Sequence, residues 1–145
     1  MNNRIEKVME ETKPKRKIFK NAFQAFIIGG LFSFFAQLII EILKMIGLEK
    51  EISNNLGVTI MVFLGALLTG LGLYDKIGQY GGAGTIVPIT GFANSMASSA
   101  LEYKSEGLVL GILTNMFKLA GSVIAAGVVS AFIVGSIIYL FRGIL

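Results

Sequence analysis

Long apolar runs separated by short polar stretches dominate the chain. The first run, Ala22–Ile40, holds nineteen residues without a charge, and as a helix it would extend about 29 Å, close to the hydrocarbon thickness of a bilayer. A second uncharged run covers residues 56–73. The pattern predicts membrane-spanning helices over about 22–46 and 56–73, with a short polar connection between them.

The second half of the chain is less regular. Residues 74–84 are rich in glycine and polar side chains and predict a loop. Residues 85–100 would form a helix of about 24 Å, which is too short and too polar to face lipid comfortably. Residues 107–141 are almost uninterrupted apolar sequence, about 52 Å long as one helix.

A single straight crossing does not accommodate a helix of about 52 Å in a hydrocarbon layer of about 30 Å. We therefore predict a break at Asn115–Lys118, the most polar part of this run. The break would leave a short piece, 107–119, and a full span, 121–141.

These elements predict an all-α integral membrane protein. It would have three full transmembrane helices and a re-entrant or discontinuous helix pair, formed by 85–100 and 107–119. Non-helical backbone at membrane depth is tolerated only inside protein or beside a water-filled cavity. The charged turn at 101–106 would then lie deep in the membrane or near its far face. Five full crossings are the alternative, and they leave the C-terminus on the same side.

The composition agrees with a membrane protein and excludes several other classes. Hydrophobic residues make up 54% of the 145 residues and charged residues only 15%, against about 25% in soluble domains. Cysteine and histidine are both absent, which removes thiolate and imidazole catalysts, disulfides and the usual zinc ligands. We expect no enzymatic activity, no cofactor and no bound metal.

All of the net charge lies at the N-terminus. Residues 1–20 carry seven basic and three acidic side chains, a net charge of +4, whereas residues 21–145 are balanced at six of each. A basic cluster before an apolar run is the positive-inside signature of a cytoplasmic N-terminus. We favour this interpretation over nucleic-acid binding, with contacts to anionic lipid headgroups compatible. The division predicted is a basic cytoplasmic segment, 1–20, and a single transmembrane domain, 21–145.

A glycine-rich loop leads into the helix predicted from residue 85. Gly84, Thr85 and Pro88 stand at its start, where Thr can cap the helix and Pro fits the first turn. Helix N-termini present free N–H groups that bind anions, and half-helices in transporters use this property. The alternative is a simple tight turn between helices.

Polar side chains recur every four residues within this helix. Thr90, Asn94 and Ser98 would share one face, which should turn inward in a membrane. There it would either hydrogen-bond a neighbouring helix or line a polar pathway.

Charged residues inside apolar sequence are the remaining candidates. Lys118 is surrounded by apolar residues and needs water, an acidic partner or an anion. It would serve a pathway or a subunit contact, or would snorkel at the helix break. Glu41 and Lys44 are spaced to pair or snorkel.

Small residues recur at four-residue spacing near the C-terminus, as in Gly107/Gly111 and Gly127/Ala131/Gly135. This spacing lets helices approach closely, and it favours self-association or packing against a partner.

Several segments resemble one known family. Thr69–Lys76, Gly81–Gly84 and Val87–Ser95, which contains the string PITGFANS, are the most specific, and 99–107 and 116–121 match too. Over roughly residues 14–141 the chain resembles the SpoVAC/SpoVAEb family of sporulation membrane proteins. Its basic N-terminal extension is similar to the longer of the family's two kinds of member.

The resemblance implies a subunit of the SpoVA complex in the inner (forespore) membrane of the endospore. Such complexes move dipicolinic acid, with calcium, into the spore during sporulation and out at germination. The chain would form or line a channel, gated by membrane tension. Its implied partners are the AE-type paralogue and the soluble AD-type protein. A scaffolding subunit without its own pore is the alternative.

Dipicolinate is a small aromatic dianion, which suits the polar groups singled out above. The substrate-pathway hypothesis therefore comprises Lys118, Asn94, Thr90, Ser98, Thr85, Gly84 and Pro88.

Overall fold

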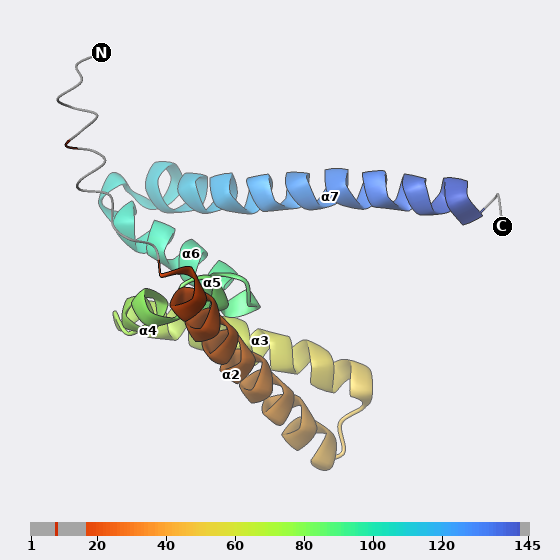
Figure 1. The fold of residues 1–145 in the computed structure, drawn as a ribbon. Helices are drawn as coiled ribbons and strands as arrows, with labels where there is room; N and C mark the ends of the chain where they lie inside the picture. The colour runs from red at the N-terminus through yellow and green to blue at the C-terminus, as the bar shows by residue number, and fades with distance from the viewer. Residues whose placement is uncertain (1–7, 9–16, 143–145) are drawn as a thin grey trace.

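The structure, a computed structural model, describes Val8 and residues 17–142, which contain helices and no β-strand (Figure 1). Two long helices, α2 (Ile18–Met45) and α3 (Lys50–Gly70), are followed by short α4 (Tyr74–Gly81) and α5 (Ala83–Ile86). Then come α6 (Ile89–Glu102), a 3₁₀ turn (Lys104–Glu106), a π-helical turn (Leu108–Leu113) and α7 (Thr114–Arg142). The predicted all-α architecture is confirmed. Most of the predicted basic segment, 1–20, lies outside the described residues.

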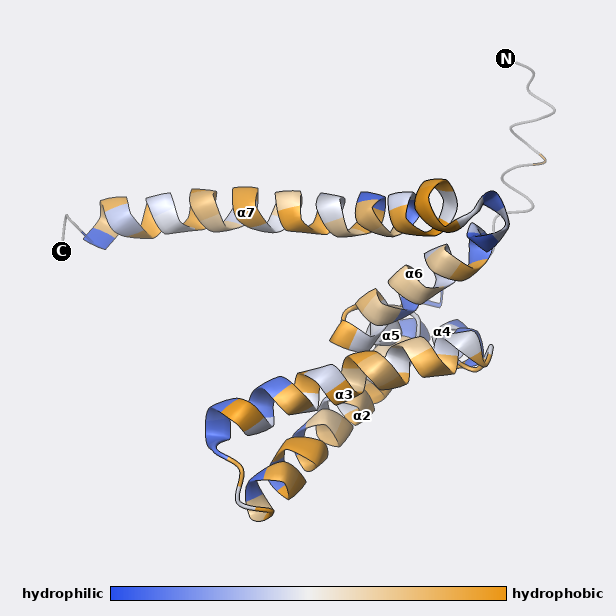
Figure 2. Ribbon diagram, turned by 180° about the vertical axis from the view of Figure 1, so that it is seen from behind, coloured by the Kyte–Doolittle hydropathy of each residue, from blue (hydrophilic) through white to orange (hydrophobic). Residues whose placement is uncertain are grey.

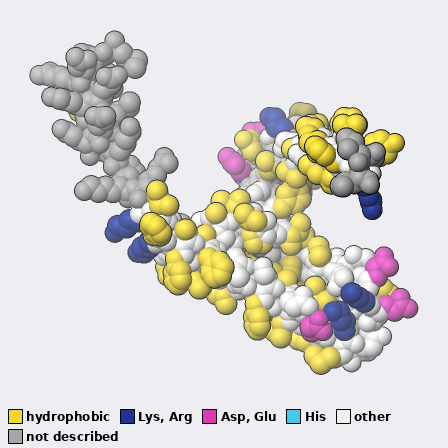
Figure 3. Space-filling model, turned by 45° about the vertical axis from the view of Figure 1, so that its right-hand side comes forward, with side chains coloured by type: hydrophobic (Ala, Val, Ile, Leu, Met, Phe, Trp, Pro, Cys, Tyr) yellow, Lys and Arg dark blue, Asp and Glu magenta, His cyan; other side chains and the backbone are white. Residues whose placement is uncertain are grey.

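Three helices are long and apolar enough to cross a membrane: α2, α3 and the continuous stretch Leu108–Arg142. This confirms the three predicted spans, although α2 begins four residues before the predicted start at 22 and α3 ends before residue 73. Figure 2 shows many apolar residues on the visible faces of α2 and α7. In Figure 3 hydrophobic side chains cover much of the visible surface, and charged side chains gather in separate groups.

The interior is built from small and hydroxyl-bearing residues rather than large apolar ones. Along α3 the buried positions are Ser53, Gly57, Met61 and Gly65, four residues apart. Gly57 faces Ile40 of α2, and Gly65 faces the backbone of Thr90 and the side chain of Ala93 in α6. Small residues at this spacing let helix backbones approach closely, the usual basis of helix packing in membranes.

The segment predicted as a loop over 74–84 is mostly helical. Its first residue, Tyr74, is 2% exposed, and its ring centroid lies 6.0 Å from that of Phe32 in α2. Gly82, with a φ of 49°, provides the positive-φ turn between α4 and α5. Gly84 packs directly on the backbone of Ala25. Thus α4 and α5 lie against the first half of α2, and tertiary contacts outweigh the low helix propensity of this glycine-rich segment.

The break predicted at Asn115–Lys118 is wrong, because α7 runs through it without interruption. The polar side chains there bond to the preceding turn: Thr114 donates to the Val109 carbonyl (2.8 Å) and Asn115 to the Gly111 carbonyl (2.9 Å). The predicted short piece 107–119 therefore belongs to the last long helix. Residues 119–141, without a charge, suffice to cross the hydrocarbon at about 34 Å.

The short helices preceding this span are therefore α4, α5 and α6. The predicted segment 85–100 corresponds to the end of α5 and most of α6. Figures 1 and 2 place the turn after α6 on the same side of the molecule as the start of α2.

Most of α7 stands away from the other helices (Figure 1), and none of its residues is buried. Gly127 and Gly135 face open space. The association predicted for this small-residue face stays a prediction.

A methyl group at Gly65 should destabilise the fold, since it would lie 2.9 Å from the Thr90 carbonyl oxygen and 3.1 Å from the Thr90 Cα. For Gly65→Ala we expect a loss of about 1–3 kcal/mol, measured as unfolding in detergent. Gly70→Ala is the matched control, because nothing lies within 4 Å of that position. Equal stability of the two variants would contradict this account of the α3–α6 contact.

The position of the turn after α6 also predicts from which side of the membrane cysteines introduced in this turn can be labelled. Single cysteines at Glu102 and Lys104, in a chain without native cysteine, should react with a membrane-impermeant maleimide from the N-terminal side of the membrane. The basic N-terminal segment predicts that this side is the cytoplasm. Reaction from the opposite side alone, or protection from both sides, would mean that this turn lies deep or across the membrane.

Candidate functional site

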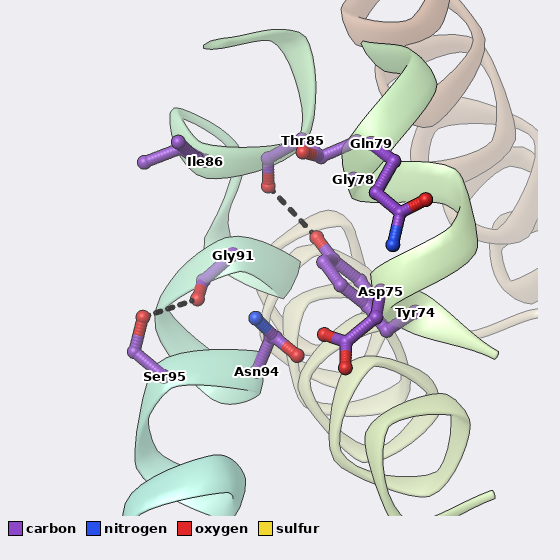
Figure 4. A pocket seen from close by; sticks show the side chains of 9 residues that line it. All are labelled: Tyr74, Asp75, Gly78, Gln79, Thr85, Ile86, Gly91, Asn94 and Ser95. Atoms are coloured by element: carbon purple, nitrogen blue, oxygen red, sulfur yellow. Dashed lines mark hydrogen bonds between the residues drawn. The ribbon is translucent and has the colours of Figure 1, made fainter. Parts of the chain in front are cut away.

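A cavity of about 390 Å³ lies where α4, α5 and α6 meet (Figure 4). It is lined by Tyr74, Asp75, Gly78, Gln79, Thr85, Ile86, Gly91, Asn94 and Ser95. Its volume falls in the range of about 300–1,000 Å³ typical of small-molecule pockets. Most of these residues carry polar side chains, so the cavity suits a polar or hydrated ligand.

Two further cavities adjoin the first. One, of about 360 Å³, lies between α6 and the start of α7 and is lined by Ser95, Ser98, Ser99, Glu102, Tyr103, Asn115, Lys118 and Leu119. The other, of about 490 Å³, lies between the start of α2 and the α4–α5 junction, and includes Gln24 and Gln79. Because Ser95 lines the first two cavities and Gln79 lines the first and third, the three form a series along α6 and α4.

Tyr74 closes the inner wall of the first cavity. Its hydroxyl donates to the Thr85 carbonyl (2.8 Å) and is also hydrogen-bonded to the Thr90 hydroxyl (3.0 Å). Burial raises the pKa of the Tyr74 hydroxyl, and the bond to Thr90 opposes this rise. Tyr74 thus stays protonated at neutral pH and ties α4 to both α5 and α6.

Asn94 is fixed in orientation by the neighbouring long helix. The Thr69 hydroxyl of α3 donates to Asn94 Oδ1 (2.7 Å), with the Gly65 carbonyl as a second acceptor at 2.7 Å. The same Asn94 side chain lines the first cavity. Both uses predicted for this polar face, helix contact and cavity lining, therefore meet at one residue.

The predicted pathway residues separate into two groups. Asn94 and Thr85 line the first cavity, and Ser98 and Lys118 line the second. Thr90, only 2% exposed, lies in the α3–α6 contact and lines none of these three cavities. Gly84 serves the contact with α2.

The helix start differs from the prediction at Thr85 and Pro88. Thr85 belongs to α5 and its hydroxyl donates to the Gly82 carbonyl (2.8 Å), whereas α6 begins after Pro88 with no side-chain cap. Gly91, in the first turn of α6, packs against the carbonyl oxygens of Thr85 and Ile86. Carbonyl oxygens crowd this helix start and disfavour an anion there, because their partial charge is negative.

Lys118 shares its cavity with a carboxylate, Glu102. Within residues 17–142 Lys118 makes no ion pair or hydrogen bond. Its ammonium group is thus exposed and available to a ligand.

Sequence patterns alone did not single out Asp75, Gln79 or Glu102 as cavity residues. Asp75 and Glu102 follow or end apolar segments and read as solvated turn residues. The signal that could have found them is the polar spacing Asp75–Gln79, which places both side chains on one helical face.

Elsewhere, the predicted pairing of Glu41 and Lys44 is confirmed at 2.8 Å, with Gln37 donating to the same carboxylate. No group of three or more metal-ligating His, Cys, Asp or Glu side chains occurs in the described part of the chain.

Replacing Tyr74 by Phe should loosen the junction of α4, α5 and α6. The change leaves the buried Thr85 carbonyl and Thr90 hydroxyl without this partner, a loss of about 1–3 kcal/mol. Limited proteolysis in detergent should then cut near the α4–α5 turn faster than in the parent chain. Tyr80→Phe, at a position 61% exposed, is the control. Equal resistance of the two variants to proteolysis would contradict the conclusion that the Tyr74 hydroxyl holds these helices together.

Comparison with known proteins shows the family to which this chain belongs. The family model described as SpoVAC/SpoVAEB sporulation membrane protein matches residues 21–137. Stage V sporulation protein AC of Bacillus subtilis (strain 168) is 50% identical over 131 residues, which cover 90% of this chain and 87% of the relative. No solved structure matches the chain. The family model and this relative agree with the resemblance seen in the sequence, and the chain belongs to the SpoVAC/SpoVAEB family of sporulation membrane proteins.

Proposed function

We propose that this chain is a membrane subunit of the SpoVA complex that forms or lines a channel for dipicolinic acid, accompanied by calcium. It would act in the inner membrane of the endospore, in uptake during sporulation and in release at germination. The observation that carries the proposal is the pair of cavities that share Ser95 and are lined largely by polar side chains, in a chain of this family.

The route would begin at the cavity between α6 and α7. This cavity lies near the turn after α6, on the side where α2 starts, and that side is cytoplasmic under the positive-inside rule. The unpaired ammonium of Lys118 would attract a carboxylate of dipicolinate there. Ser98 and Asn115 supply further hydrogen-bonding groups.

The route would continue past Ser95 to the cavity at the α4–α6 junction. Tyr74 and Phe32 place this junction beside the middle of α2, so the cavity would lie at membrane depth. Polar groups at that depth are stable only beside water or protein. The exposed sides of Asp75, Gln79 and Ser95 therefore support a neighbouring subunit that closes the route, such as the AE-type paralogue. Gating by membrane tension would act on this assembly.

A scaffolding subunit without its own pore is the second candidate. It is favoured by α7, whose Gly127 and Gly135 face open space and offer a close-packing surface to another helix. A scaffold would carry no dipicolinate when the full chain is placed alone in liposomes.

Removing the Lys118 charge should slow dipicolinate release from germinating spores. For Lys118→Ala and Asn94→Ala we expect about tenfold slower release, because one charged or polar ligand contact contributes about 1.5 kcal/mol. Release is followed by the absorbance of dipicolinate in the medium.

Two controls separate the pathway from folding. Thr59→Val removes an exposed hydroxyl that bonds only to the Asn55 carbonyl of its own helix and lines none of the three cavities, and it should release dipicolinate at the parent rate. Immunoblotting checks that each variant reaches parental levels. Parental release by Lys118→Ala and Asn94→Ala at normal protein levels would contradict the proposed route.

A further inference from the structure

The cavity between the start of α2 and the α4–α5 junction has no part in the proposed route. It measures about 490 Å³, and its α2 residues extend from Ile18 to Ala25. The uncharged run of α2 begins at Ala22 and is about as long as the hydrocarbon layer is thick. Lys17 and Lys20 would therefore lie at the level of the lipid headgroups. The cavity spans the boundary between headgroups and acyl chains.

The polar lining of this cavity has no protein partner. The side chains of Asn21, Gln24 and Gln79 and the Tyr80 hydroxyl make no hydrogen bond within residues 17–142. Gln24 is half-buried, and its amide needs water or a ligand as a partner, because an unpaired buried polar group is costly. The cavity thus presents free hydrogen-bond donors from both α2 and α4.

The charge beside the cavity is positive. No carboxylate lines it, and residues 13–20 contain five basic side chains and no acidic one. Lys17 and Lys20 are exposed and make no ion pair in the described part of the chain. They precede Asn21 and Gln24 by four residues, so each lysine lies on the same side of α2 as one of the cavity amides. Asp75, the carboxylate of α4, lines the adjoining cavity instead. These surroundings favour an anion.

Apolar groups adjoin the same cavity. Four lining residues are apolar, namely Ile18, Ala22, Ala25 and Ala83. Beside them on α2 stand three exposed aromatic side chains, Phe19, Phe23 and Phe26. Figure 3 shows basic side chains next to hydrophobic ones at the start of α2. A ligand with both a charged and an apolar part fits these surroundings better than a water-soluble anion.

We propose that this cavity binds the headgroup of an anionic phospholipid. The lysines and the Asn21 and Gln24 amides would hold the phosphate, and an acyl chain would lie along the exposed phenylalanines. Tyr80 at the edge of the cavity is typical of the membrane interface, where aromatic residues anchor helices. Because the lining comes from α2, α4 and α5, one bound lipid would tie the start of α2 to the α4–α5 junction. The site does not depend on transport by this chain.

Lipid binding is tested by fluorescence quenching, because the chain has no tryptophan. Phe23→Trp places an indole beside the cavity. Phe34→Trp is the matched control, since both positions are 66% exposed and lie three turns apart on the same face of α2. The full chain is placed in phosphatidylcholine bilayers, and the quencher is brominated phosphatidylglycerol or brominated phosphatidylcholine.

At position 23 we expect phosphatidylglycerol to bind at least fivefold more tightly than phosphatidylcholine, the effect of one lysine near anionic lipid. At position 34 we expect no preference. Equal affinities of the two lipids at position 23, or the same preference at both positions, would overturn the site.

Two sets of variants separate the cavity from general surface charge. In the Phe23→Trp chain, Asn21→Leu with Gln24→Leu removes the amides and leaves the charge unchanged, and the preference should fall below twofold. Lys17→Gln with Lys20→Gln should have the same effect. Asn54→Leu with Asn55→Leu is the control, because these exposed residues of α3 line none of the three cavities. A full preference without the Asn21 and Gln24 amides would overturn the assignment to this cavity.

Excess inorganic phosphate distinguishes a lipid from a free anion. At matched ionic strength, the preference for phosphatidylglycerol at position 23 should persist when phosphate replaces chloride. Loss of the preference in phosphate alone would show that the cavity takes a free phosphate and would overturn the lipid.

Discussion

The close approach of α6 to α3 is the contact on which the other features depend. At Gly65 the two backbones come so near that a methyl group would press on the Thr90 carbonyl, and one turn later Thr69 bonds to Asn94. With α6 held there, Thr90 can meet the Tyr74 hydroxyl, and Tyr74 in turn holds α4 and α5 against α2. The cavity among α4, α5 and α6 exists because small and hydroxyl-bearing residues fix these helices in place. Large apolar side chains would have filled it.

Hydropathy sufficed for the parts of the fold that face lipid. The three long helices are specified by uninterrupted apolar sequence, and no tertiary information is needed to find them. Two elements could not be found in this way. Residues 74–81 have a weak local preference for helix and become helical through burial of Tyr74. Residues 114–115 are polar yet stay helical, because their side chains bond to carbonyls of the preceding π-helical turn.

The candidate site shows the same division between local pattern and tertiary contact. Asn94, Ser98 and Lys118 were identified from periodicity and unusual polarity, and each lines a cavity. The periodicity could not separate Thr90, which is buried against α3, from Asn94, which reaches both α3 and a cavity. The sequence favoured a solvated turn for Asp75, because only the folding of α4 toward α6 gives its carboxylate a place in the lining of a cavity.

The unbroken helix from Leu108 to Arg142 makes a rigid lever joined to the compact part of the chain at one end. At 1.5 Å per residue the lever is about 52 Å long, and Lys118 lies about 15 Å from its attached end. A sideways displacement of the free end therefore moves Lys118 by roughly a third as much. Movement of the free end in the plane of the bilayer would therefore change the distance between Lys118 and Glu102 by a smaller amount. These two residues line one cavity, Glu102 from the end of α6 and Lys118 from the start of α7.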